Sequence, residues 1–213
     1  MAASGAIGLA QRLRALPDVV EVLTRPAELF SYESDGLTLE RGAPLCVAFP
    51  TTAESVSAIV RACNEAGVPY VPRGAGTGLS GGASPVNGCV VIECARMDRV
   101  LEIDATNRTA TVQPGVVNEH LSHAVRPLGL FYAPDPSSQS ACTIGGNVAE
   151  NSGGPHTLKY GTTSPHVLEL VLAGRVKIAP FVERRPLSTI DNVFGALARH
   201  EITKRPVLVP DLS

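Results

Sequence analysis

The sequence predicts an α+β fold, and three observations along the chain support that prediction. A β-α-β pattern occupies the first part, two alternating segments behind it are typical of an antiparallel hairpin, and the composition changes near residue 174. Hydrophobic residues make up 44% and charged residues 18% of the 213 residues, which is an ordinary globular balance. The chain is therefore long and apolar enough to bury a sizeable core.

The β-α-β pattern follows a helix that we expect over residues 6–16. Residues 45–49 are a short apolar run that ends at Pro50 and is typical of a strand. In the next segment, Thr51 and Glu54 have the spacing of a capping box. The apolar residues behind them recur at helical spacing, namely Val56, Ile59, Val60 and Cys63. Gly67 is the expected stop of this helix, and residues 69–72 form the second strand.

The glycine-rich segment 72–82, PRGAGTGLSGG, follows that second strand directly. Residues 76–81 match G-x-G-x-x-G, the fingerprint of Rossmann dinucleotide-binding proteins. A Rossmann site requires a helix after the glycines, whereas here Pro85 and an Asn-Gly pair lead into a strand at residues 89–93. A phosphate-binding loop of the Walker A type is excluded as well, because no lysine follows Gly82.

Phosphate binding without a helix is the interpretation that we favour for this loop. Glycines permit positive φ, and successive backbone N–H groups can then surround an anion. The hydroxyls of Thr77 and Ser80 add donors, and Arg73 adds positive charge. The alternative is a mobile surface turn.

The second half of the chain pairs a hairpin and a helix with another small-residue segment. Strands are expected at residues 100–104, 108–114 and 166–174, and a helix ends at Gly129. Residues 134–161 again combine glycines with hydroxyls and amides. Two such segments about 60 residues apart favour a long ligand held at two points, such as a dinucleotide. Ordinary structural glycine turns are the alternative for each segment.

Charge and cysteine usage narrow the classes of partner and compartment. The net charge of −2 and the absence of Trp give no reason to expect a nucleic-acid partner. No run approaches 18 apolar residues, so we expect no membrane span. Five cysteines without a C-x-x-C spacing indicate buried thiols in a reducing compartment such as the cytoplasm. The N-terminus is typical of a surface helix, with a transit peptide as the alternative. We expect no metal site.

The tail, residues 175–213, differs in composition from the rest. It carries seven Lys and Arg against four acids, while residues 1–174 carry eleven against sixteen. It contains four prolines, and only residues 189–201 have a helical pattern. The sequence therefore predicts a boundary near residue 174.

The two small-residue segments together resemble the FAD-linked oxidases of the vanillyl-alcohol oxidase superfamily. Within it, the chain is most similar to the group of the glycolate oxidase flavin subunit and the D-lactate dehydrogenases. Residues 31–52 and 97–118 carry the same resemblance, which extends from about residue 18 to residue 173. It implies a two-subdomain FAD-binding domain of the PCMH type (the p-cresol methylhydroxylase type).

The resemblance also implies a domain plan. Residues 1–40 would form a helical lead-in and residues 41–174 the FAD-binding domain, with subdomains over 41–113 and 114–174. The second subdomain would be incomplete, residues 175–213 would be a divergent tail, and no substrate (cap) domain would follow. The similarity stops at residue 174, so we expect a truncated family member.

The implied cofactor is non-covalent FAD, since the loop carries no histidine for a flavin link. The residues that match the family's cofactor contacts are Pro72, Arg73, Gly74, Gly76, Thr77, Gly78, Ser80, Gly81, Gly82, Pro134, Asp135, Ser137, Ser138, Thr143, Gly145, Gly146, Asn147, Asn151, Gly153, Tyr160 and Gly161. No catalytic residue is assigned. His156 and His166 flank Tyr160, and we interpret both as local loop residues rather than bases.

The implied reaction is oxidation of a D-2-hydroxy acid, glycolate or D-lactate, with hydride transfer to flavin N5. Implied partners are the hydroxy acid and other oxidase subunits, including an iron-sulfur subunit that accepts electrons. A partner subunit would hold the protein, otherwise cytoplasmic, at the periphery of a membrane. Two alternatives stay open: a non-catalytic FAD-binding or subunit-interaction module, and an inactive fragment.

Overall fold

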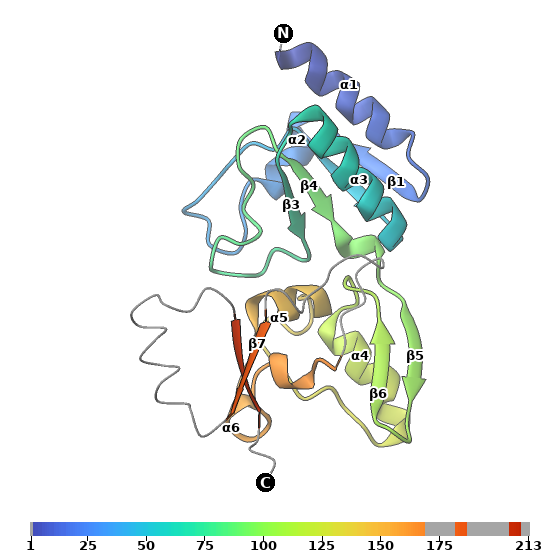
Figure 1. Cartoon of the computed structure of the whole chain (residues 1–213), viewed down its shortest axis with the longest axis vertical. Coiled ribbons are helices and arrows are strands. Elements are labelled where there is room, and N and C mark those ends of the chain that lie inside the picture. The colour runs from blue at the N-terminus through green and yellow to red at the C-terminus, as the bar shows by residue number, and fades with distance from the viewer. Residues whose placement is uncertain (1, 169–181, 187–204, 210–213) are drawn as a thin grey trace. The chain divides into compact units, whose positions relative to one another are not determined.

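The computed structural model describes residues 2–168, 182–186 and 205–209 and divides the chain into two units, Met1–Leu170 and Val171–Ser213 (Figure 1). Two sequence predictions lie outside the described residues: the boundary at residue 174 and the helix over residues 189–201. Of the strand predicted over residues 166–174, only residues 166–168 are described, and they form no strand because His166 ends a 3₁₀ helix. In the second unit, β7 (Val182–Pro186) pairs in parallel with β8 (Arg205–Val209).

The first unit begins with a four-stranded sheet whose order is β1-β2-β4-β3. Its parallel strands are β2 (Cys46–Pro50), β3 (Tyr70–Arg73) and β4 (Val90–Glu93), and α3 (Ala53–Ala66) connects β2 to β3. These bounds confirm the predicted β-α-β pattern. The two strands of that pattern are not neighbours, however, because β4 pairs with both and lies between them.

The start of α3 differs by one residue from the prediction. Thr52 is the N-cap, and its Oγ1 accepts a hydrogen bond from the Ser55 backbone N–H at 3.1 Å. Thr51 is unavailable for capping because both its N–H and its hydroxyl donate to the Asp18 carbonyl. The predicted Thr51 capping box is therefore wrong, whereas the predicted stop is confirmed: Gly67 has φ 63° and closes the helix in the left-handed region.

Helices cover both faces of this sheet. On one face, α1 (Ala2–Arg14) and α3 bury Leu13, Ile59 and Cys63 against the strands. On the other face, Leu29 of α2 (Pro26–Leu29) packs with Phe49 and neighbouring strand residues. Both faces are covered at the two inner strands, so every residue of β2 and of β4 is buried.

The segment 1–40 is more than the expected helical lead-in, because β1 (Val19–Leu23) extends the sheet. It pairs antiparallel with β2, in the register Val22 with Ala48 and Leu23 with Val47. The signal for this strand was the β-branched run VVEVL, in which Val22 points into the core.

A second, smaller core follows in the same unit. The predicted hairpin is confirmed as β5 (Val100–Asp104) paired antiparallel with β6 (Thr109–Val112). The predicted helix is α4 (Asn118–Val125), which buries Leu121 and Val125 against the hairpin. Two short helices, α5 (Ile144–Glu150) and α6 (Thr157–Tyr160), lie in the second small-residue segment, where the sequence predicted none. Short 3₁₀ helices occupy Phe30–Tyr32, Cys94–Arg96, Arg126–Leu128 and Ser164–His166.

The connection from β3 to β4, residues 74–89, contains no helix and no strand. Parallel neighbours require a connection that returns the chain to the opposite end of the sheet, which explains its length. A strand rather than a helix follows the G-x-G-x-x-G segment, so the rejection of a Rossmann site is confirmed. Among the described helices, none is long and apolar enough to cross a membrane.

Candidate functional site

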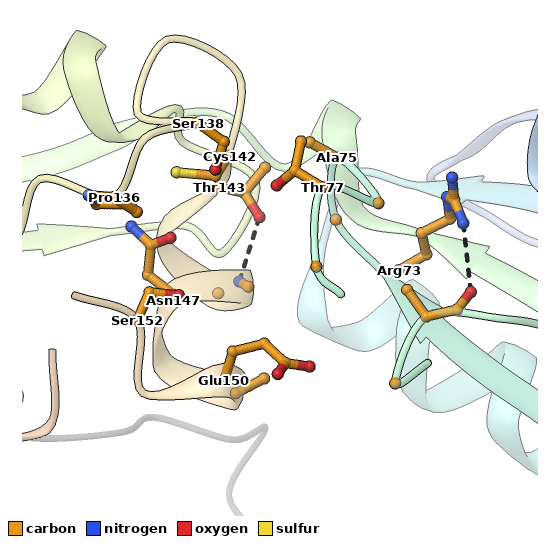
Figure 2. Close-up of a pocket in the computed structure, with 18 of the residues that line it drawn as sticks. Arg73, Ala75, Thr77, Pro136, Ser138, Cys142, Thr143, Asn147, Glu150 and Ser152 are labelled. Carbon is orange, nitrogen blue, oxygen red and sulfur yellow. Dashed lines mark hydrogen bonds between the residues drawn. The ribbon is translucent and has the colours of Figure 1, made fainter. Parts of the chain in front are cut away.

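The glycine loop and α5 line one cavity of about 650 Å³ in the first unit. Segments from both small-residue stretches contribute to its wall, and Figure 2 shows Thr77 and Thr143 facing each other across it. Gly74 brings the two stretches into contact, since a Cβ built there would lie 2.3 Å from Thr143 Oγ1. The two segments that the sequence assigned to one ligand thus belong to one site.

Most of the predicted site residues lie in the wall of this cavity. These are Pro72, Arg73, Gly74, Gly76, Thr77, Gly78, Gly82, Ser137, Ser138, Thr143, Gly145, Gly146, Asn147 and Gly153. The other predicted residues do not line it, namely Ser80, Gly81, Pro134, Asp135, Asn151, Tyr160 and Gly161. The wall also includes Ala75, Leu79, Pro136 and Ser152, which lie inside the predicted segments but were not singled out as contacts. The lining residues that sequence reasoning missed are Ala83, Cys94, Pro114, Cys142, Ala149 and Glu150.

The glycines of the loop occupy their positions for different structural reasons. Gly76 has φ 67°, and a Cβ there would lie 2.2 Å from the Arg73 guanidinium, so both conformation and space require glycine. At Gly78 the φ is ordinary, and a Cβ would meet only the Glu150 side chain, at 3.8 Å. The loop therefore leaves room at Gly78 for a ligand to approach the backbone.

Arg73 lies behind the loop rather than over the cavity. Its side chain is 8% exposed, and its guanidinium donates to the carbonyls of Ser34 and Ala83. It also lies over the ring of Tyr32, 5.5 Å from the centroid. Figure 2 shows the side chain directed away from Thr77 and Thr143. This geometry suits a residue that holds the loop in shape.

Glu93 is the buried carboxylate closest to Arg73, with 3.7 Å between Arg73 Nε and Glu93 Oε2. Burial raises the pKa of Glu93 to about 7, although the backbone N–H of Ala95 and the Arg73 charge both oppose the rise. Beneath the loop, the positively charged Arg73 side chain therefore lies next to a carboxyl group, Glu93, that titrates near neutral pH.

Asp35 is a second support of the loop that sequence reasoning did not single out. The side chain is buried, and its Oδ2 accepts the backbone N–H of Gly81 at 2.9 Å. Its Oδ1 accepts the N–H of Leu37 at 2.8 Å. One of the loop's N–H donors is therefore already used by a structural carboxylate. The only sequence signal was the Asp-Gly pair at 35–36, where the Gly36 backbone closely approaches the loop.

The opposite wall is α5, which presents polar groups to the cavity. Thr143 is its N-cap and accepts the N–H of Gly146 at 3.2 Å. Asn151 ends the helix in the left-handed conformation, with φ 51°. Asn147 is 1% exposed and lines the cavity, and its Nδ2 has no hydrogen-bond partner among the described residues. A buried donor without a partner is costly, which indicates that a ligand group completes it.

Glu150, the last residue of α5, reaches the glycine loop. Its carboxylate accepts a hydrogen bond from the Ser80 hydroxyl. Its Oε1 lies 2.8 Å from the position of a Cβ built on Gly82. This contact spans 70 residues of sequence and joins the two walls of the cavity.

Asp135 and Tyr160 belong to a separate cluster next to the cavity. Asp135 Oδ1 accepts the backbone N–H of His156 at 2.9 Å, and His156 Nδ1 lies 3.1 Å from the Ala133 carbonyl oxygen. The rings of His156, Tyr160 and Phe131 pack edge to face. The interpretation of His156 as a local loop residue agrees with these contacts.

The wall of the cavity suits a long, polar ligand with a phosphate portion. Backbone donors and hydroxyls come from the loop, the orphaned Asn147 amide comes from α5, and Gly78 leaves a space that a Cβ would fill. The volume lies in the range of small-molecule and cofactor sites. Among the described residues no group of three His, Cys, Asp or Glu side chains could hold a metal ion. These features fit the dinucleotide FAD.

Comparisons with known proteins agree with this chemistry. The family model described as "FAD binding domain" matches residues 44–173. The chain is 52% identical over 151 residues to the glycolate oxidase subunit GlcD of Escherichia coli strain K12, covering 71% of this chain and 30% of that protein. It is 40% identical over 162 residues to the D-2-hydroxyglutarate dehydrogenase of Xanthomonas citri pv. viticola, covering 75% and 34%.

A solved structure shares the fold as well. The alkyldihydroxyacetonephosphate synthase matches with a TM-score of 0.65 and 26% identity, over 73% of this chain and 34% of that one. The chain spans about a third of the length of these curated relatives.

Proposed function

Because the chain belongs to the family of FAD binding domains, with FAD as its cofactor, we propose that it supplies the FAD-holding part of a D-2-hydroxy-acid oxidoreductase. The proposed substrate is glycolate or D-lactate, and the proposed product is the 2-oxo acid. The names of two relatives support this substrate class, since glycolate and D-2-hydroxyglutarate are both 2-hydroxy acids. The observation that carries the proposal is the cavity between the glycine loop and α5.

Different residues of the wall would bind different parts of the cofactor. The N–H groups of the glycine loop and the Thr77 hydroxyl would bind the diphosphate, since they present donors without a bulky side chain. The Asn147 amide would bind an oxygen farther along the cofactor, because its Nδ2 is buried without a partner. Arg73 and Asp35 would act indirectly, by fixing the loop from behind. When bound, FAD supplies the hydride acceptor. We propose that it is held non-covalently.

A second candidate function is a non-catalytic FAD-binding module. Among the described residues that line the cavity there is no histidine, and Glu150 is the one carboxylate. A hydroxy-acid oxidation needs a proton acceptor near the substrate hydroxyl, and the wall offers no group aimed for that role. In this case the chain would hold FAD while other chains complete the active site.

One experiment distinguishes a chain that oxidises the hydroxy acid itself from a non-catalytic FAD-binding module. The purified chain is expected to retain FAD and to show the visible absorption bands of an oxidised flavin. Anaerobic addition of glycolate or D-lactate would bleach those bands if the chain oxidises the substrate itself. Retained bands with no bleaching would favour the module, and a colourless protein that takes up no added FAD would contradict both.

The proposed partners follow from the name of one relative, which is a subunit of glycolate oxidase. We propose that other oxidase subunits, including an iron-sulfur subunit that accepts electrons, assemble with this chain and hold it at the periphery of a membrane. We also propose a cytoplasmic location. The five free cysteines, of which four are buried, support a reducing compartment.

A further inference from the structure

Glu150 occupies the face of the glycine loop on which the cofactor would bind. The carboxylate accepts a hydrogen bond from Ser80, and its Oε1 lies near Gly82. Its carboxyl carbon lies 3.8 Å from the position of a Cβ built on Gly78. Figure 2 shows the side chain reaching from α5 toward the loop. The space that the loop leaves open is therefore bounded by a negative charge.

No positive charge balances this carboxylate among the described residues. Glu150 forms no ion pair there, and the one basic residue in the wall, Arg73, is turned behind the loop and bonded to carbonyls. The carboxylate of Glu150 is exposed, so it can rotate into solvent without losing buried contacts. Glu150 thus accepts one donor of the loop, the Ser80 hydroxyl, while its carboxylate stays free to leave the glycine face.

We propose, on the basis of the FAD-binding function proposed above, that Glu150 is a latch that competes with the cofactor's diphosphate for the glycine loop. Without cofactor, the carboxylate closes the cavity by bonding to Ser80 and resting on the glycine face. The diphosphate carries negative charge of its own, so the two anions cannot occupy the face together. Binding therefore requires Glu150 to swing out, and the latch weakens FAD binding.

Flavin affinity measures the competition directly. Glu150→Gln keeps the size and hydrogen-bonding capacity of the side chain but removes its charge. We expect its Kd for FAD, measured by quenching of flavin fluorescence, to fall roughly three- to tenfold. The matched control is Glu119→Gln, which removes an exposed carboxylate on α4 away from the cavity and should leave the Kd unchanged.

A second measurement tests the latch without any flavin. In the cofactor-free chain, backbone amides of residues 76–82 are expected to exchange hydrogen about threefold or more faster in Glu150→Ala and Ser80→Ala than in the unmodified protein. Both variants remove the same contact from opposite sides. Unchanged exchange in both variants would overturn the latch.

The outcomes separate this inference from the proposed function. If FAD binds but Glu150→Gln leaves the Kd unchanged, the latch is overturned and the function stands. If Glu150→Gln raises the Kd, Glu150 is a cofactor ligand, for example for ribose hydroxyls, and the latch is also overturned. If no variant binds FAD, the proposed function itself fails.

Discussion

Arg73 and Glu93 form a buried pair that supports the glycine loop from behind. The guanidinium fills the space beneath Gly76 and links the loop to Ser34 and Ala83. The carboxyl group beneath it is 5% exposed and has a raised pKa. At the scale of single residues, the shape of the loop therefore depends on two groups. The sequence assigned Arg73 to the ligand, and no sequence pattern singled out Glu93.

The raised pKa of Glu93 predicts a pH-dependent loss of stability. The folded chain binds this proton more tightly than the unfolded chain, so the free energy of unfolding falls as pH rises from near 4.5 to about 7. Glu93→Gln should remove this decline, which amounts to roughly 3 kcal/mol at most. Denaturant unfolding at several pH values measures it. Glu102→Gln, at an exposed position in β5, is the control and should keep the decline.

A substitution at Gly78 tests whether FAD approaches the backbone of the glycine loop. A Cβ there meets no backbone and the φ is ordinary, so Gly78→Val should fold normally but fill the cavity. We expect its Kd for FAD to rise at least about tenfold while its Tm stays within about 2 °C. Gly76→Val should lose both FAD affinity and thermal stability, because its φ is positive and its Cβ would meet the Arg73 guanidinium. An unchanged Kd in Gly78→Val would contradict the assignment of the loop.

At the scale of elements, α5 organises the wall of the cavity although it has only seven residues. Its N-cap, Thr143, contacts the loop at Gly74, and its C-terminal Glu150 contacts the loop at Ser80. Gly145 fits against Pro114, with a Cβ position 2.9 Å from the Pro114 carbonyl oxygen. The helix is thus fixed by two contacts in its first turn and by one at its C-terminal end.

Two N-caps with the same chemistry separate stability from binding. Thr52→Ala and Thr143→Ala each remove a hydroxyl that caps a helix, at a cost of about 1 kcal/mol in the free energy of unfolding. Only Thr143 lines the cavity. We therefore expect both variants to lose stability and only Thr143→Ala to lose FAD affinity, by about threefold or more. Equal Kd values in the two variants would show that α5 does not position the cofactor.

Periodic elements could be predicted from the sequence, whereas contacts between distant segments could not. The spacing of Ile59 and Cys63 and the stop at Gly67 identified α3 because these signals are local. The helix α5 was missed because paired glycines at 145–146 disfavour a helix, and packing against Pro114 overrides that preference. The contact of Glu150 with Ser80 spans 70 residues and has no local signal.

At the scale of the whole molecule, the described residues that line the candidate site all belong to the first unit, and most of them come from segments 72–83 and 136–153. A ligand bound to both segments would link parts of the chain that the two small cores hold separately. Binding energy in such a site adds to the free energy of unfolding of the unit.

FAD should therefore raise the thermal stability of the chain, and the diphosphate should account for much of the rise. At about 100 times its Kd, FAD stabilises the folded state by about 2.7 kcal/mol. For a chain of this size, Tm should increase by roughly 5–10 °C. Riboflavin, which lacks the diphosphate, should produce a much smaller shift at the same concentration. Equal shifts in differential scanning calorimetry would show that the glycine loop does not hold the diphosphate.

The position of β4 between β2 and β3 has a consequence for synthesis on the ribosome. While the nascent chain extends only to residue 89, β2 has one unpaired edge and β3 has two, although both strands have already been made. Unpaired edges promote association between chains. The polar, glycine-rich segment 74–89 must leave the ribosome before β4 can insert and pair with one edge of β2 and one edge of β3. The length of segment 74–89 thus sets how long these strand edges stay unpaired during synthesis. During that time the nascent chain depends on chaperones or on low concentration to avoid aggregation.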